Sequence, residues 1–234
     1  MKLNFHGHAF FELELASGAR IAIDPFTADA GNPLTQTQAA DLDVEAVLLT
    51  HGHGDHFGAT LDIGKPVLAI HEIMQYCASQ GLEDAAGTGG GGMNIGGTVE
   101  VAGADVTMVP AIHSGGCPGH DGPFLGEGGH AAGFIIDDGE TTLYHMGDTF
   151  LFGDMKMVLA DLFDIDLALT PIGDVFTMGP EVAARAVDWV DADAAIPIHY
   201  DTFEPIQQDP TRFADAVTSG ADVHVLKPDS SLTY

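Results

Sequence analysis

The sequence predicts an α/β protein with a layered core that contains β-sheet. Its 234 residues are enough to bury a sizeable core, and 45% of them are hydrophobic, which excludes a disordered chain. The apolar residues form short runs with strand periodicity, and helical patterns lie between these runs. No run approaches the ~20 apolar residues that cross a bilayer. We therefore expect one domain over residues 1–234 and no membrane partner.

Strand patterns dominate the first half of the chain. Apolar runs or period-2 alternation predict strands at 2–6, 9–15, 19–23, 44–50, 66–70, 98–102 and 105–109. A helical pattern covers about 72–79. The glycine-rich residues 86–97 predict a flexible connection.

The second half repeats this organisation after a long loop. Residues 113–130 contain seven glycines, two prolines and three histidines, a composition typical of a functional loop. Strands are predicted at 132–137, 141–145, 166–170, 194–198 and 222–227, and helices at about 153–163, 180–190 and 210–219. Pro180 suits the first position of its helix, and Gly220 suits the position just after the last one.

The charge is strongly negative. Seven Lys and Arg residues stand against 35 Asp and Glu residues, a net charge of -28. Such a field repels phosphate backbones, so we expect no nucleic-acid partner. The scattered carboxylates resemble a halophile's surface, since molar salt shortens the Debye length to about 3 Å and screens their repulsion. An acidic mesophilic protein is the alternative. An acidic surface also leaves homo-oligomerisation open at high salt.

Two features predict a cytoplasmic protein. The first residues lack the apolar segment of a signal peptide. Cys77 and Cys117 are too few for a disulfide framework, which favours a reducing compartment.

The strongest functional signal follows the predicted strand at 44–50. Its sequence is Thr50-His51-Gly52-His53-Gly54-Asp55-His56. Imidazole and carboxylate groups are the usual ligands of zinc and similar ions. His51 and His53 point the same way from an extended backbone, and the glycines allow the loop to turn back toward the same centre. A chance cluster of polar loop residues is the weaker alternative.

Three further ligand-type residues follow predicted strands. His113, Asp148 and His199 each come shortly after the carboxyl end of a strand, where ligands gather in α/β proteins. They form a second, independent indication of a metal site.

These residues resemble the ligand series of the metallo-β-lactamase superfamily. Within it, the chain is similar to the metal-dependent hydrolases related to L-ascorbate-6-phosphate lactonase. The matching segments are residues 7–8, 23–26, 49–56, 93–97, 109–114, 144–149, 151–155, 171–173, 176–181 and 196–200. They occur in the same order and span nearly the whole chain.

The resemblance implies a four-layer αβ/βα sandwich with two divalent metal ions at one edge. Zinc is the first expectation, with manganese and iron as alternatives. The implied ligands are His51, His53 and His113 for one metal, Asp55, His56 and His199 for the other, and Asp148 between them. A bridging water would lose a proton near neutral pH. The resulting hydroxide would attack an ester, lactone, amide or phosphoester of a small-molecule substrate.

Two other residues match family motifs at strand ends. Asp24 could orient a metal-bound histidine or simply form a turn before Pro25. His8, which we count with Asp55 and Asp148 among the catalytic candidates, could line the pocket or assist proton transfer. A structural strand histidine is the alternative for His8 and also for His145.

The long loop and the segment after 171–173 carry weaker candidates. His120 and His130 could touch substrate or be ordinary exposed loop histidines, and Cys117 is not expected to bind metal. Relatives often carry Gly-Asn or Gly-His after the Pro-Ile-Gly of residues 171–173, where this chain has Asp174-Val175. The charge of Asp174 would disfavour an anionic substrate.

Two other function classes remain open. A non-haem iron oxidoreductase similar to the sulfur dioxygenases of the superfamily would use the same residue types. A non-catalytic metal-binding protein is disfavoured because the whole ligand series is present.

Overall fold

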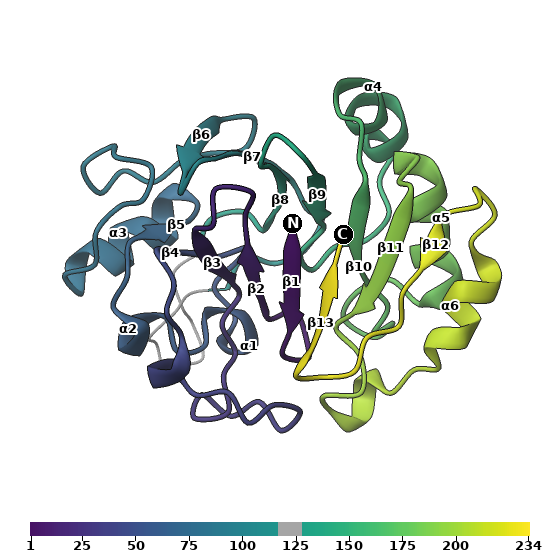
Figure 1. Cartoon of the computed structure of the whole chain (residues 1–234), viewed down its shortest axis with the longest axis horizontal. Coiled ribbons are helices and arrows are strands. Elements are labelled where there is room, and N and C mark those ends of the chain that lie inside the picture. The colour runs from purple at the N-terminus through teal and green to yellow at the C-terminus, as the bar shows by residue number, and fades with distance from the viewer. Residues whose placement is uncertain (117–127) are drawn as a thin grey trace.

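Two β-sheets face each other, and helices cover their outer surfaces (Figure 1). The computed structural model describes residues 1–116 and 128–234. Helices α1 to α3 lie beside the first sheet, and α4 to α6 lie beside the second. The expected four-layer αβ/βα sandwich is confirmed.

The first sheet joins the start of the chain to its end. Its order is β13-β1-β2-β3-β4-β5. The bounds are β1 (Lys2–Phe5), β2 (Phe11–Glu14), β3 (Arg20–Ile23), β4 (Ala46–Leu48), β5 (Val67–Leu68) and β13 (Ser230–Thr233). The helices beside it are α1 (Gly54–Phe57), α2 (Thr60–Ile63) and α3 (His71–Ser79). Strands β13 to β3 pair antiparallel, whereas β3, β4 and β5 are parallel.

The second sheet has the order β12-β11-β10-β9-β8-β7-β6. Its strands are β6 (Thr98–Val101), β7 (Ala104–Pro110), β8 (Ala132–Asp137), β9 (Thr142–His145), β10 (Leu167–Pro171), β11 (Ala194–Ile198) and β12 (Asp222–Val223). Its helices are a π-helical turn (Met155–Leu159), α4 (Ala160–Leu162), α5 (Pro180–Val190) and α6 (Pro210–Ala216). Strands β6 to β9 pair antiparallel, and β9 to β12 are parallel.

Side chains that alternate along the second sheet build two separate cores. Phe134 and Ile136 of β8 belong to the core between the sheets, together with Leu13 of β2. Ile135 between them belongs to the core under the helices, together with Val187 of α5. Because successive strand residues point to opposite faces, a continuous apolar run in β8 supplies both cores.

The topology gathers six loops at one edge of the sandwich. In the first sheet β1, β3 and β4 run in the same direction, and in the second sheet β7, β9, β10 and β11 do so. Three candidates follow strands of the first sheet: His8 after β1, Asp24 after β3 and the motif at 51–56 after β4. Three follow strands of the second sheet: His113 after β7, Asp148 after β9 and His199 after β11. The carboxyl ends of these strands therefore carry every candidate ligand.

Backbone contacts tie the two sheets together at that edge. The amide of His199 donates to the carbonyl of His8 at 2.8 Å, and the amide of Ala132 donates to the carbonyl of Thr50 at 2.9 Å. Within the second sheet, Gly173 after β10 lies so close to His199 after β11 that a Cβ atom there would be 2.4 Å from the His199 carbonyl oxygen.

Several sequence-based details need correction. Helix α6 ends at Ala216, so Gly220 is not the residue after its last turn, although its φ of 94° is positive. The carboxylate of Asp188 accepts hydrogen bonds from the amides of Thr218 and Ser219, which ends the helix early.

The sequence patterns also missed α1, α2 and β13. Pro180 is confirmed at the start of α5. Among the described residues, no helix has the length and apolar character to cross a membrane.

Candidate metal centre

The structure brings all seven predicted ligands together. Their donor atoms form overlapping sets, and within each set the atoms lie within 4.8 Å of one another. The sets are His51, His53 and His113; His51, His56 and Asp148; and His8, Asp55, His56 and His199. His113 and His199 thus reach the motif at 51–56, as the strand-end positions predicted.

Asp148 lies at the middle of this cluster. Its Oδ2 atom lies 3.0 Å from Nε2 of His199, 3.4 Å from Nε2 of His56 and 3.5 Å from Nε2 of His113. The Nε2 atom of His51 is 4.0 Å away. Only 3% of the Asp148 side chain is exposed. One buried carboxylate oxygen therefore faces histidines from both sheets.

The spacing of the donor atoms suits a small divalent ion. Ligands at about 2.1 Å from a tetrahedral zinc ion lie about 3.4 Å from each other. The separations around Asp148 are close to this value, and Nε2 of His51 lies 2.8 Å from Nδ1 of His53. The cluster is therefore compact enough for several of its members to bind one ion.

Asp24 orients two of the histidines. Nδ1 of His56 donates to Asp24 Oδ2 at 2.7 Å, and the Thr50 hydroxyl donates to the same oxygen at 2.6 Å. Nδ1 of His51 lies 3.0 Å from the Thr50 hydroxyl oxygen and donates to it. A proton on each Nδ1 leaves Nε2 as the ring atom that an ion can use, and both Nε2 atoms face the cluster.

The ionisation states of the clustered side chains favour the binding of a cation. Burial disfavours the charged form of His56, but the carboxylates of Asp148 and Asp24 outweigh burial and raise its pKa well above the usual value. Burial likewise opposes ionisation of Asp148, yet His199 and His56 hold the pKa of its carboxyl well below the usual value. Burial lowers the pKa of His51 and of His113, which keeps both imidazoles neutral. The ionised carboxylate of Asp148 beside the neutral imidazoles of His51 and His113 has the chemistry of a cation site.

Unpartnered buried atoms point to the same conclusion. Within the described ranges, His56 Nε2, His199 Nε2 and Asp148 Oδ1 are buried and have no hydrogen-bond partner. Buried polar atoms without partners are costly, so an ion that used their lone pairs would remove this cost. The donor set therefore fits a divalent metal.

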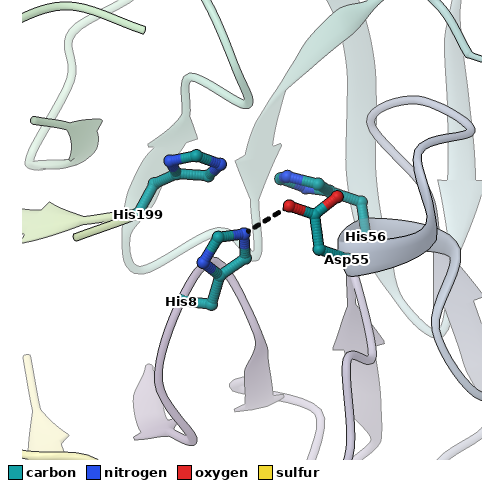
Figure 2. Close-up of side chains that lie close together, drawn as sticks. All are labelled: His8, Asp55, His56 and His199. Carbon is teal, nitrogen blue, oxygen red and sulfur yellow. Dashed lines mark hydrogen bonds and ion pairs between the residues drawn. The ribbon is translucent and has the colours of Figure 1, made fainter. Parts of the chain in front are cut away.

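His8 contacts the cluster from the turn after β1 (Figure 2). Its Nε2 donates to Asp55 Oδ2 at 3.1 Å, and its Nδ1 accepts from the Thr202 hydroxyl at 2.8 Å. Burial and the neighbouring His199 lower the pKa of His8 to about 4. His8 has a φ of 59° and lies in the turn after β1, so its expected place in a strand is wrong, although both of its ring nitrogens have hydrogen-bond partners.

Sequence reasoning missed Thr202, the residue that fixes the ring of His8. The two lie 194 positions apart, and no pattern joins them. The only available signal is that Thr202 comes three residues after His199.

His145 links the loops that carry His8 and Asp148. It is fully buried, and burial lowers its pKa. Its Nε2 donates to the Ala9 carbonyl at 3.1 Å, and its Nδ1 accepts from the Gly147 amide at 3.1 Å. His145 is the last residue of β9, as the strand alternative expected, and both of its ring nitrogens are used in hydrogen bonds to the two loops.

The weaker candidates are placed differently. His130 is exposed, whereas His120 and Cys117 lie outside the described residues. Asp174 is exposed and adopts a φ of 67°, one residue after the glycine that packs against His199.

Comparisons with known proteins agree with this geometry. A family model described as a beta-lactamase superfamily domain matches residues 19–200. A UPF0173 metal-dependent hydrolase from Methanopyrus kandleri is 42% identical over 238 residues, which covers 99% of each chain. Another from Bacillus cytotoxicus is 41% identical over 237 residues and covers 100% of both chains.

A solved structure supports the same assignment. Igni18, a metallo hydrolase from the archaeon Ignicoccus hospitalis, superposes with a TM-score of 0.84 at 35% identity over 100% of this chain and 97% of its own. The chain therefore belongs to the UPF0173 family of metal-dependent hydrolases, within the metallo-β-lactamase superfamily.

Proposed function

We propose that the protein uses two divalent metal ions to hydrolyse an ester, lactone or phosphoester bond of a small molecule. Zinc is the first metal that we propose. The observation that carries this proposal is the position of Asp148 Oδ2, which lies within 3.5 Å of histidines from three different loops. A carboxylate in that position can contact two metal ions at once.

The remaining ligands divide between two sites. We assign His51, His53 and His113, which form one compact donor set, to one metal. We assign Asp55, His56 and His199 to the other metal; they belong to a second donor set that also contains His8. Bound metal ions would supply a hydroxide near neutral pH, since coordination lowers the pKa of water to about 7.

The chain's own residues hold this arrangement. Asp24 keeps a proton on Nδ1 of His56 and, through Thr50, on Nδ1 of His51. His8 acts in catalysis by fixing Asp55 through its Nε2. With a pKa of about 4 it is neutral at pH 7, so it holds this carboxylate without adding a charge.

Metal removal combined with one substitution tests the proposal. Chelation should abolish hydrolysis of a panel of esters, lactones and phosphodiesters, and added zinc or manganese should restore it. Asp148→Ala should remove activity while circular dichroism stays unchanged. Full activity of this variant would contradict the bridging assignment. Bound iron with oxygen consumption and no hydrolysis would favour the oxidoreductase instead.

A further inference from the structure

Exposed apolar side chains gather on the loops that carry the candidate ligands. The three most exposed phenylalanines of the described residues are Phe150 at 57%, Phe176 at 55% and Phe203 at 39%. Ile112 and Val175 are exposed by 53% and 64%. We call these five residues the apolar rim. Large apolar side chains in water are costly, and a group of them beside a site indicates contact with a ligand.

The topology places the apolar rim at the same edge as the metal centre. Ile112 precedes His113 after β7, and the Phe150 amide donates to the Ile112 carbonyl at 3.1 Å. Phe203 follows His199, and its ring centroid lies 5.8 Å from that of His8.

The loop after β10 completes this edge. Strand β10 runs parallel to β9 and β11, so its loop with Val175 and Phe176 emerges beside theirs. Gly173 at the start of this loop packs against His199. Apolar side chains thus come from four loops around one centre.

The same loops lack basic residues. In the sequence, no Lys or Arg occurs in residues 3–19, 21–64, 66–155, 157–184 or 186–211, which include the segments bearing the candidate ligands and the loop after β10. Carboxylates occur there instead, among them Asp174, Asp201 and Glu204. Recognition of a phosphate or carboxylate group ordinarily uses Arg or Lys. The surroundings of the centre therefore disfavour a substrate with an anionic group away from the reacting bond.

We propose that the substrate is a neutral ester or lactone with an apolar chain, and that the apolar rim binds this chain. The inference rests on the proposed function and narrows it by excluding phosphoesters. One water molecule is consumed: its oxygen bonds to the carbonyl carbon, the bond from that carbon to the alcohol oxygen breaks, and the alcohol oxygen takes a proton.

A matched set of probes tests the substrate class. They are p-nitrophenyl butyrate, p-nitrophenyl octanoate, mono-p-nitrophenyl succinate and bis-p-nitrophenyl phosphate. For each probe, the hydrolysis rate measured with chelator-treated protein is subtracted. We expect kcat/KM to rise about twofold per methylene from butyrate to octanoate, since complete burial of a methylene is worth roughly fourfold. The anionic succinate should react at least about tenfold more slowly than the butyrate, because the surrounding carboxylates repel it.

Substitution of the apolar rim tests its role. Phe150→Ser should lower kcat/KM for the octanoate about tenfold and for the butyrate less than about threefold, because mainly the longer chain reaches the ring. Leu162→Ser is the matched control. Leu162 is 65% exposed and lies beside Thr142, at the start of β9 and thus at the opposite edge. It should change neither value.

Each outcome separates this inference from the proposed function. Metal-dependent hydrolysis that favours the succinate or the phosphodiester would overturn the inference and leave the proposed function standing. If no probe is hydrolysed, calorimetric binding decides: octanamide should bind more tightly than butyramide, and Phe150→Ser should remove the difference. Light scattering of Phe150→Ser covers the remaining possibility. If the variant loses an oligomeric state and keeps both kcat/KM values, the apolar rim is an interface between copies of the chain, and the proposed binding of substrate by the rim is contradicted.

Discussion

Nδ1 of His56 donates to Oδ2 of Asp24 at 2.7 Å, and both side chains are completely buried. The same oxygen accepts the hydroxyl proton of Thr50, whose oxygen contacts Nδ1 of His51. A single carboxylate, itself outside the donor sets, thereby fixes the tautomers of two donors.

Loss of this carboxylate should weaken metal binding. Asp24→Asn should lower the affinity for zinc about 10- to 100-fold, because neither histidine then keeps its orientation. Thr50→Val should have a smaller effect, since it disturbs only His51. Competition with a chromophoric chelator measures both affinities. The exposed Asp43 offers a control, Asp43→Asn, which should bind as the unsubstituted protein does. If the three variants bind zinc with the same affinity as the unsubstituted protein, Asp24 does not orient the two histidines.

His145 should contribute to stability as well as to the site. In His145→Phe the buried amide of Gly147 loses its acceptor, which costs about 1–3 kcal/mol. Urea unfolding of metal-free protein measures this loss. His145→Gln, which retains an acceptor and a donor, should recover part of it. A His145→Phe variant as stable as the unsubstituted protein would show that the two hydrogen bonds are unimportant.

The carboxylate of Asp188 should make stability depend on pH. Burial opposes its ionisation, but hydrogen bonds from Thr218 and Ser219 outweigh burial and lower its pKa below the value usual for an aspartate. Its contribution is therefore complete above about pH 4 and disappears as the pH falls through the folded-state pKa. Asp188→Ala should destabilise metal-free protein by about 1 kcal/mol at pH 7, a difference that shrinks in acid. The control is Asp215→Ala on α6, which leaves the hydrogen bonds to Asp188 intact and should not destabilise the protein in urea titrations at pH 7.

The charge of -28 predicts a dependence on salt. The melting temperature should rise steeply between 0.1 and about 1 M KCl, where the Debye length falls to about 3 Å and screening of the carboxylates is nearly complete. Differential scanning calorimetry measures the change. A melting temperature that is independent of salt would identify an acidic mesophilic protein instead.

The sequence predicts which candidate ligands meet at one edge, because much of this signal is local. His51, His53, Asp55 and His56 stand in one short motif, and the other ligands follow strands whose direction fixes the edge that they reach. Their mutual distances depend on the strand order and on how the two sheets face each other, which the sequence patterns do not give.

Contacts between distant segments could not be predicted in this way. The Thr202 hydroxyl meets His8 across 194 residues, and Asp188 ends α6 from a different helix. Strand β13 pairs with β1 although its burial alternates only between intermediate and exposed residues, so it carries no apolar signal. Such features depend on tertiary packing, which overrides local propensity.

The stoichiometry of bound metal tests the central claim most directly. Plasma mass spectrometry of protein purified without added metal and dialysed against metal-free buffer should find about two divalent ions per chain. His113→Ala and His199→Ala should each retain about one, because they affect different donor sets. Asp148→Ala should reduce the content to one or fewer, because its Oδ2 atom lies between the sets. Two ions per chain in Asp148→Ala, or none in the unsubstituted protein, would contradict the account.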